Sequence, residues 1–293
     1  MARLVFLGTP EAAVAPLRAL EHAGHEVVLV VTRPDKRRGR RGEPTPSPVK
    51  AAALELGLPV TEVLEAVPEA GAELGVVVAY GRIIPEAVLD VVPMVNLHFS
   101  LLPRWRGAAP VERAILEGDA ATGVCLMAVE SGLDTGGIYA ELETAIEEEE
   151  TAEELRSRLV SLGTALLVET LADGVAGLPQ PRDQMGSPSY AEKIRSAELR
   201  LEWAQPAVQL RRVVRIGRAW TTFRGSRLGV VQAGGGDGGD PLAPPGTLIG
   251  PDVIAGDGGR VRLVTVQPEG RRPMAAEDWL RGARPTADEQ LGT

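Results

Sequence analysis

The sequence of 293 residues is poor in cysteine and has no long apolar run. Its single cysteine, Cys125, excludes an intramolecular disulfide and any cysteine-rich metal site, and its apolar neighbours predict a buried structural thiol rather than a nucleophile. The longest apolar runs, such as residues 27–31 and 76–80, fall far below the ~20 residues that a membrane-spanning helix needs. Because Gly8 and Pro10 interrupt the apolar stretch at the N-terminus, we expect no secretory leader. These absences favour a cytoplasmic protein without membrane contact.

Signatures of nucleotide and metal binding are also missing. Residues 6–11 (FLGTPE) lack the second and third glycines of a dinucleotide fingerprint, and Gly107 is not followed by the Lys-Ser/Thr of a phosphate-binding loop. The three histidines and the carboxylates show no metal-ligand spacing, so we expect no metal. The hydrophobic fraction of 44% is nevertheless that of a folded globular protein.

Charge is distributed unevenly along the chain. The net charge of −9 excludes indiscriminate binding of nucleic acids. Residues 33–50 nevertheless carry seven basic and two acidic side chains, and residues 193–227 carry nine basic and two acidic ones. Residues 141–154 form the opposite pole, with eight acids and no base. An acidic protein with two concentrated basic segments could hold one polyanion at a defined place.

Short apolar runs alternate with amphipathic stretches over the first 180 residues. This alternation predicts a parallel sheet buried on both faces, with helices as connections. The expected strands are 4–7, 26–32, 74–80, 95–99 and 124–129, and the expected helices are 12–23, 47–56 and 110–117. Thr151 and Glu154 form a capping-box pattern before a leucine stripe (Leu155, Leu159, Leu162 and Leu166), which predicts a closing helix.

The second part of the chain has a different texture. A stretch rich in Pro, Gly and Ser begins near Gly174 and is typical of a linker. Beyond it, a helix at 207–216 and short strands separated by glycine-rich turns predict a small β-rich barrel or sandwich. Residues 35–48 (DKRRGRRGEPTPSP) are too polar for a core element and predict a long functional or disordered loop in the first domain.

Three polar side chains could form a site at the carboxyl edge of the sheet. Asn96 and His98 are two residues apart on a predicted strand, so they share a face and suit stabilisation of an oxyanion and proton movement. Asp134 lies in a glycine-flanked turn after another strand, where its carboxylate could orient His98 and favour its charged form. From spacing alone, two structural alternatives remain open: a polar pair that merely ends a strand, and an Asp that bonds its own backbone, which spacing favours when Asp134 is taken singly.

Several longer motifs, in this order, resemble those of the folate-dependent formyltransferases. They are LVFLGTPEAAV, GHEVVLVVTRPDK, TPSPVK, VVVAYGRIIP, Asn96 with His98, SLLPRWRGAAP, GLDTG around Asp134, and QPEGRRPM, almost from end to end of the chain. The resemblance implies a Rossmann-like α/β catalytic domain with a mostly parallel sheet over residues 1–182. It also implies a linker at 183–202 and a small, OB-like β-barrel domain that binds tRNA at 203–293.

The resemblance also implies the reaction and the residues that carry it. The α-amino group of methionyl initiator tRNA attacks the formyl carbon of 10-formyltetrahydrofolate, the co-substrate. Asn96 and a charged His98 would stabilise the oxyanion, while Asp134 would keep His98 charged and help to carry the proton. The folate pocket would be lined by two segments, namely Ser100, Leu101, Leu102 and Pro103, and Arg82, Ile83, Ile84 and Pro85.

The basic segments favour tRNA over a small amine as the formyl acceptor. We expect tRNA contacts from Arg37, Arg38, Arg40, Arg41, Arg211 and Arg215, and a monomer. The sequence departs from the family at Phe99, where relatives often carry a small residue, and over 215–221, which lacks an Asn-Pro-Trp-Pro-Gly order. Two other functions stay open: formylation of an amino sugar or ribonucleotide amine, and a catalytically silent module that binds nucleic acid.

Overall fold

The computed structural model describes residues 1–37, 44–286 and 289–293, and this chain divides into two compact units. Unit 1 consists of Met1–Val111, Ala121–Ala145 and Leu155–Glu192, and unit 2 of Glu112–Ala120, Ile146–Glu154 and Lys193–Thr293. Residues 183–192, which the sequence assigns to a linker, lie in unit 1. The boundaries expected at residues 182 and 203 stay predictions.

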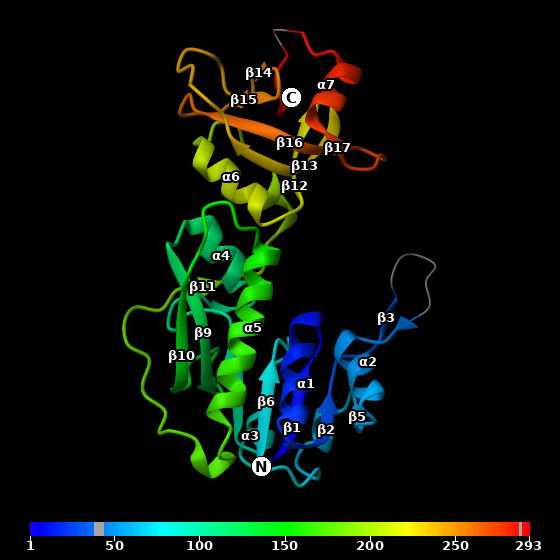
Figure 1. The fold of residues 1–293 in the computed structure, drawn as a ribbon, viewed down its shortest axis with the longest axis vertical. Helices are drawn as coiled ribbons and strands as arrows, with labels where there is room; N and C mark the ends of the chain where they lie inside the picture. The colour runs from blue at the N-terminus through cyan, green and yellow to red at the C-terminus, as the bar shows by residue number, and fades with distance from the viewer. Residues whose placement is uncertain (38–43, 287–288) are drawn as a thin grey trace. The chain divides into compact units, whose positions relative to one another are not determined.

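Unit 1 is built on a mostly parallel sheet of seven strands among the described residues (Figure 1). The strands are β1 (Arg3–Gly8), β2 (Glu26–Val31), β5 (Val60–Thr61), β6 (Leu74–Val78), β7 (Met94–His98), β9 (Ala121–Ala128) and β10 (Ile138–Ala145). Their order is β10-β9-β7-β6-β1-β2-β5, in which the β7–β9 and β9–β10 pairings are antiparallel and the others are parallel. The predicted Rossmann-like fold class is confirmed. The acidic edge strand β10 was not expected from the sequence.

The helices begin at local signals in the sequence. They are α1 (Val14–His22), α2 (Pro48–Glu55), α3 (Glu86–Leu89), α4 (Pro110–Glu117) and α5 (Ala152–Thr170), with 3-10 turns at Glu11–Ala13, Leu64–Ala66 and Val175–Gly177. The Ser47 side chain caps α2 by accepting from the Lys50 amide at 3.1 Å. Before α5, the Glu154 carboxylate accepts from the Thr151 amide at 2.9 Å, and the Thr151 hydroxyl accepts from the Glu154 amide at 3.2 Å. The predicted capping box is confirmed.

The buried face of α5 differs from the predicted leucine stripe. Leu155 and Leu159 are fully buried as expected, but Leu162 and Leu166 are only partly buried. The stripe instead continues through Gly163, where an added Cβ would lie 3.0 Å from the Leu97 side chain of β7. The missing side chain at Gly163 therefore lets the helix approach the sheet closely, and this shifts the contact face by one residue.

Unit 2 contains an antiparallel sheet whose strands pack against two helices. Its elements are α6 (Ala207–Arg215), β12 (Ala219–Phe223), β13 (Ser226–Gly235), β14 (Leu248–Ile249), β15 (Asp252–Ile254), β16 (Arg260–Pro268), β17 (Met274–Ala275), α7 (Ala276–Ala283) and a 3-10 turn at Ser196–Leu199. The strand order is β12-β13-β16-β15-β14, and β17 also pairs with β16. Phe223 and Trp279 meet edge to face at 5.2 Å in the core. The predicted β-rich second domain is confirmed as this antiparallel sheet.

Two further observations concern membranes and metals. Across the described ranges, no helix combines the length and the apolar content that crossing a bilayer requires. Within the same ranges, no three His, Cys, Asp or Glu side chains are grouped closely enough to hold a metal ion.

Candidate active site

Asn96 and His98 lie in the last three residues of β7, at the carboxyl edge of the parallel strands. β7 lies between β6, which is parallel to it, and β9, which is antiparallel, and His98 is in register with Cys125 of β9. The strand is almost fully buried, and Val95 and Leu97, which alternate along it with Asn96 and His98, belong to the core. In open α/β sheets this edge is where ligands bind. The fold therefore places both predicted side chains where a substrate could reach them.

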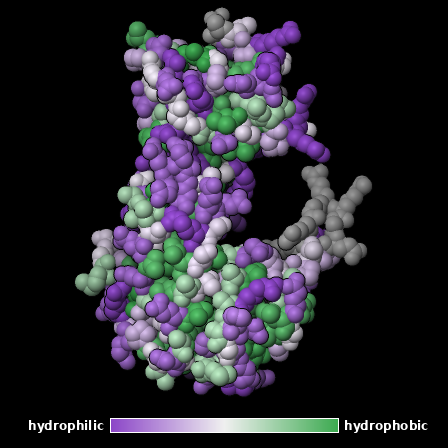
Figure 2. All heavy atoms as spheres, viewed as in Figure 1, coloured by the Kyte–Doolittle hydropathy of each residue, from purple (hydrophilic) through white to green (hydrophobic). Residues whose placement is uncertain are grey.

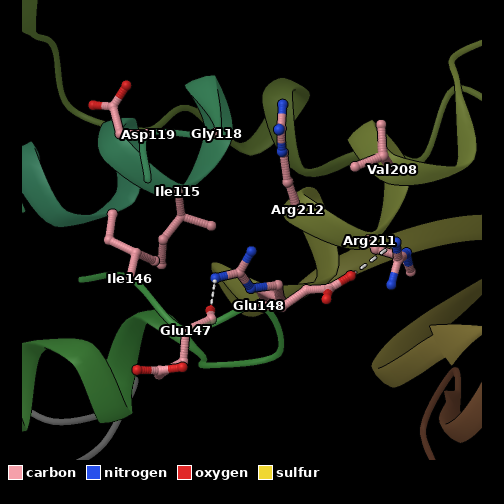
Figure 3. Close-up of a pocket in the computed structure, with 10 residues that line it drawn as sticks. Ile115, Gly118, Asp119, Ile146, Glu147, Glu148, Val208, Arg211 and Arg212 are labelled. Carbon is pink, nitrogen blue, oxygen red and sulfur yellow. Dashed lines mark hydrogen bonds and ion pairs between the residues drawn. The ribbon is translucent and has the colours of Figure 1, made fainter. Parts of the chain in front are cut away.

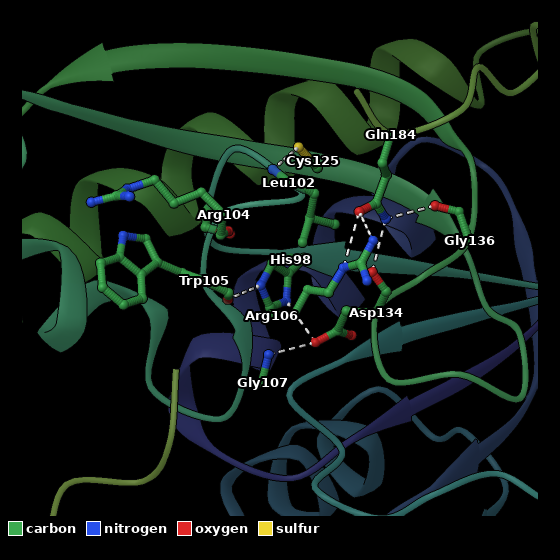
Figure 4. Close-up of polar contacts among 11 residues, drawn as sticks. His98, Leu102, Arg104, Trp105, Arg106, Gly107, Cys125, Asp134, Gly136 and Gln184 are labelled. Carbon is green, nitrogen blue, oxygen red and sulfur yellow. Dashed lines mark hydrogen bonds and ion pairs between the residues drawn. The ribbon is translucent and has the colours of Figure 1, made fainter. Parts of the chain in front are cut away.

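His98 is held through both of its ring nitrogens (Figure 4). The Nε2 atom lies 2.9 Å from the Trp105 carbonyl oxygen, which can only accept, so Nε2 carries a proton and donates it. The Nδ1 atom faces the Asp134 carboxylate, with 3.7 Å between Nδ1 and Oδ2. That distance is longer than a hydrogen bond, and the two side chains, which are 7% and 15% exposed, form an ion pair when the imidazole is protonated. A proton on Nδ1 would therefore point at the carboxylate.

Asp134 reaches this position from a tight turn after β9. Its φ of 49° lies in the left-handed region, which Asp tolerates better than most residues. The Oδ2 atom also accepts a hydrogen bond from the Gly107 amide at 2.8 Å, so the carboxylate joins two loops. Gly136 fits next to Ala128 because an added Cβ would lie 2.1 Å from its carbonyl oxygen. The glycines around Asp134 thus serve the close packing of the turn.

The Asn96 amide is the open member of the group. The residue is partly buried, and its side chain makes no hydrogen bond with any residue that the structure describes. A half-buried amide next to a held imidazole is a ready donor for a ligand oxygen. His98 and Asp134 therefore lie close together, and Asn96 shares a face of β7 with His98 and has free hydrogen-bonding capacity among the described residues.

The residues predicted to line a folate pocket follow two neighbouring strands, β6 and β7. Ile83 is 85% exposed, while Ile84 is buried. In the other segment, the Ser100 hydroxyl donates to the Arg104 carbonyl oxygen at 2.6 Å, and the Leu101 side chain packs on Gly123 of β9. This second segment therefore turns its side chains toward the protein. Its backbone and the exposed side chains of Arg82, Ile83 and Pro85 are what a ligand could contact.

The predicted tRNA contacts fall in two places. Arg37 lies in the short strand β3 (Lys36–Arg37), which pairs with β4 (Pro44–Thr45), and it is exposed. Arg38, Arg40 and Arg41 lie outside the described residues. The base of this segment is fixed in unit 1, because Lys50 binds the carboxylates of Asp35 at 2.9 Å and Glu62 at 3.0 Å. These bonds raise the pKa of the Lys50 ammonium.

Arg211 and Arg215 lie on α6, within unit 2, and each has partners there (Figure 3). The Arg211 guanidinium lies 2.9 Å from Glu149 and 3.7 Å from Glu148. Arg215 donates to the carbonyl oxygens of Glu147 and Glu150, both at 2.8 Å, and burial lowers the pKa of its guanidinium.

The same arginines line a pocket of about 240 Å³ in unit 2, together with Arg212, Ile146 and Val208. The acidic partners, Glu147 to Glu150, directly precede α5, and in Figure 2 hydrophilic residues gather where this helix begins. The sequence thus located a charged surface, and the structure supplies carboxylates and carbonyls as the present partners of its arginines.

Cys125 is a buried thiol, as predicted. Its sulfur accepts from the Leu102 amide at 3.4 Å, and burial raises the pKa of the thiol to about 12. At neutral pH the thiol is therefore uncharged and unsuited to nucleophilic attack.

Sequence reasoning did not predict the residues whose hydrogen bonds fix His98 and the Asp134 turn. Trp105, Arg106 and Gly107 supply a carbonyl, a guanidinium and an amide to it, and Gln184 bonds the Asp134 turn. The motif SLLPRWRGAAP pointed to the first three of these residues but not to their contacts, and Gly107 itself, with φ of 120° and Ala191 against it, has no room for a side chain. Gln184 lies in a stretch whose composition predicted a linker, so nothing in the sequence pointed to it.

The chain matches two family models, "Formyl transferase" over residues 2–171 and "Formyl transferase, C-terminal domain" over residues 193–284. It is 43% identical to the methionyl-tRNA formyltransferase of Paracoccus denitrificans, covering 96% of this chain and 97% of that one. It is 42% identical to the enzyme of the same name from Thiobacillus denitrificans, covering 99% of each chain.

Solved structures share the fold at lower identity. An N-formyltransferase from Helicobacter canadensis, in complex with folinic acid and dTDP-3-aminofucose, superposes with a TM-score of 0.69 at 17% identity, covering 92% of this chain and 100% of that one. A methionyl-tRNA formyltransferase from Clostridium thermocellum gives 0.61 at 15% identity, covering 90% and 99%. From the family models and the close relatives together, the chain belongs to the formyl transferase family and carries both of its domains.

Proposed function

We propose that this protein transfers a formyl group from 10-formyltetrahydrofolate to the α-amino group of methionyl initiator tRNA, in the cytoplasm and as a monomer. The observation that carries the proposal is the proximity of His98 and Asp134, with Asn96 on the same face of β7 as His98, in a formyl transferase domain. Near-complete coverage of relatives named methionyl-tRNA formyltransferase supports tRNA as the acceptor. All three side chains come from one copy of unit 1, which supports action as a monomer.

The residues fit a folate-borne formyl group. The Asn96 amide has no hydrogen-bond partner among the described residues, and the exposed Ile83 offers an apolar surface at the same edge of the sheet. The formyl carbon is the chemical contribution of the co-substrate. Ser100 to Pro103 and Arg82 to Pro85 would contact the folate, through backbone groups and the exposed side chains of Arg82, Ile83 and Pro85.

Each catalytic residue has a separate task when the amine attacks the formyl carbon. Negative charge develops on the formyl oxygen, and the Asn96 amide donates to it while His98 supplies positive charge from a fixed ring. As the new N–C bond forms, the amine loses a proton, and the bond from carbon to the folate nitrogen breaks as that nitrogen gains one. Asp134 faces Nδ1 of His98 and assists this transfer, through water where the distance requires it.

The basic segments are assigned to the tRNA. Arg37 belongs to unit 1 and is followed in the sequence by Arg38, Arg40 and Arg41, and Arg211 and Arg215 belong to unit 2. Phosphate binding by such arginines depends on salt, because counterions are released from the RNA.

The test is formylation of methionyl initiator tRNA by the purified protein with 10-formyltetrahydrofolate. We expect formylmethionyl-tRNA, and a much lower rate with methionyl elongator tRNA as the matched control. A nucleotide-linked amino sugar is the second control. Faster transfer to that amine than to the tRNA would overturn the tRNA assignment, and no transfer to any amine would overturn the enzymatic role.

A further inference from the structure

Residues 182–191 follow the closing helix and hold both loops of the candidate site. Arg182 pairs with Ile138 through two backbone hydrogen bonds of 2.8 and 3.0 Å. Further along, β11 (Tyr190–Ala191) pairs in parallel with β8 (Arg106–Gly107). The Ser189 hydroxyl accepts from the Trp105 amide at 3.0 Å. This segment lies between the two family-model matches, which end at residue 171 and resume at residue 193.

Gln184 makes the central contacts of this segment (Figure 4). Its Nε2 donates to the carbonyl oxygens of Asp134 at 2.8 Å and Gly136 at 2.9 Å. Its Oε1 accepts from Nε and Nη2 of Arg106, at 3.1 and 2.6 Å. Both donor hydrogens and the acceptor oxygen of the amide are therefore in use. A side chain with these contacts fixes two loops that are far apart in the sequence.

The two donated hydrogen bonds act on a turn whose backbone conformation is unfavourable for a residue other than glycine. Asp134 adopts φ of 49°, and its carbonyl and that of Gly136 are the two atoms that Gln184 holds. The Asp134 side chain leaves this backbone toward Nδ1 of His98. A left-handed aspartate without these bonds could relax, and its carboxylate would then move relative to the imidazole.

We propose that Gln184 is a positioning residue for formyl transfer, which sets the Asp134 carboxylate against His98 without touching the substrate. The inference rests on the proposed function. It assigns a catalytic contribution to a residue outside both family-model matches, in a stretch with the composition of a linker. The effect should appear in kcat, because the geometry of Asp134 matters in the reacting complex and the tRNA contacts are assigned elsewhere.

The experiment compares three full-length variants in the formylation assay. Gln184→Ala removes all four hydrogen bonds, whereas Gln184→Glu keeps the acceptor for Arg106 and cannot donate to either carbonyl. Gln180→Ala is the matched control, since Gln180 is exposed and lies four residues earlier in the same segment. We expect kcat to fall about tenfold in both Gln184 variants, with KM for tRNA within about twofold, and no change for Gln180→Ala.

A double-mutant cycle tests whether Gln184 acts through Asp134. In an Asp134→Ala background, Gln184→Ala should lower kcat by no more than about twofold further, because its target is already gone. An unchanged kcat in Gln184→Glu would overturn the proposal, and this variant also decides the matter should Gln184→Ala fail to fold. An undiminished loss in the Asp134→Ala background would overturn it as well. No product from the unaltered protein would overturn the proposed function and this inference with it.

Discussion

The polar group in unit 1 and the arginine cluster in unit 2 make opposite use of charge. In unit 1, His98 and Asp134 hold each other at 3.7 Å, and the neighbouring Asn96 keeps its amide free of protein partners among the described residues. In unit 2, Arg211 faces two carboxylates and Arg215 two carbonyl oxygens. The first group is arranged with capacity left for a ligand, whereas the second has its capacity occupied by the protein.

This difference shows that a count of basic residues does not measure the surface available to a polyanion. Residues 193–227 carry a net charge of +7 by sequence, yet several of their arginines are bound inside unit 2. A partner that needs those arginines has to displace Glu148 or Glu149, which are 82% and 59% exposed. Surface pairs of this kind are weak, so displacement at Arg211 is feasible, whereas a phosphate that binds Arg215 has to compete with two hydrogen bonds to backbone carbonyls.

The largest expected effect is on the unit 1 group. Asp134→Asn removes the charge that faces His98 while it keeps the shape of the side chain, and it should lower kcat by ~10²–10³-fold. His98→Ala should cost at least as much. Asp90→Asn, an exposed aspartate of the same unit, is the control and should leave kcat unchanged. Steady-state formylation kinetics measure all three. Near-normal turnover of Asp134→Asn would remove the contrast between the two regions.

The convergence of the unit 1 group could be anticipated because it rests on strand ends. Alternation on β7 puts Asn96 and His98 on one face, and the carboxyl edge of a parallel sheet is a general binding place. The same reasoning recovered most strands and the capping box of α5. The prediction of the buried face of α5 failed, because Gly163 has no side chain and was not counted among the residues that contact the sheet.

Tertiary partners of polar side chains could not be predicted from the sequence. Gln184 bonds carbonyl oxygens that lie 50 and 48 residues earlier, and no local pattern encodes such a distance. For Arg211 and Arg215, helical spacing correctly placed both on one face but gave no information about which groups that face meets. Strand β10 was missed because its exposed glutamates read as an acidic pole rather than as the outer face of an edge strand.

The second prediction concerns the stability of unit 2. Arg215→Met keeps the aliphatic stem and removes the two hydrogen bonds from the guanidinium to the carbonyl oxygens of Glu147 and Glu150, which should lower the free energy of unfolding by about 1–3 kcal/mol. Arg211→Met, which breaks only partly exposed ion pairs, should cost about 1 kcal/mol or less. Urea unfolding of the full chain compares the two variants. Equal losses would show that the two arginines do not differ as their contacts indicate.

A third prediction asks whether Arg211 can serve the tRNA once it is released. Replacing both Glu148 and Glu149 by Gln removes its two ion-pair partners, so KM for tRNA should fall about twofold to threefold at low salt and converge with the unaltered protein at high salt. The same replacements at Glu65 and Glu69, exposed acids of unit 1, are the control for net charge. An equal decrease in both pairs would mean that only the overall charge acts.

The smallest expected effect concerns Arg113 of α4, a further arginine of unit 2 that is paired with a carboxylate of the protein. Its guanidinium lies 2.6 Å from Glu198, and this contact, ahead of the hydrogen bond from the Arg195 amide, lowers the pKa of the Glu198 carboxyl. A carboxylate with a lowered folded-state pKa contributes stability above its unfolded pKa of about 4.3, and that stability is lost as the pH falls through the folded value. At pH 7, Glu198→Gln should therefore lower the free energy of unfolding by about 1 kcal/mol or less, and the variant should unfold at a slightly lower temperature. The difference from the unaltered protein should shrink as the pH falls below the unfolded pKa and through the lowered folded value, where the native carboxyl becomes protonated. Thermal unfolding followed at both pH values measures this, and a difference that stays constant with pH would assign the effect to shape rather than to charge.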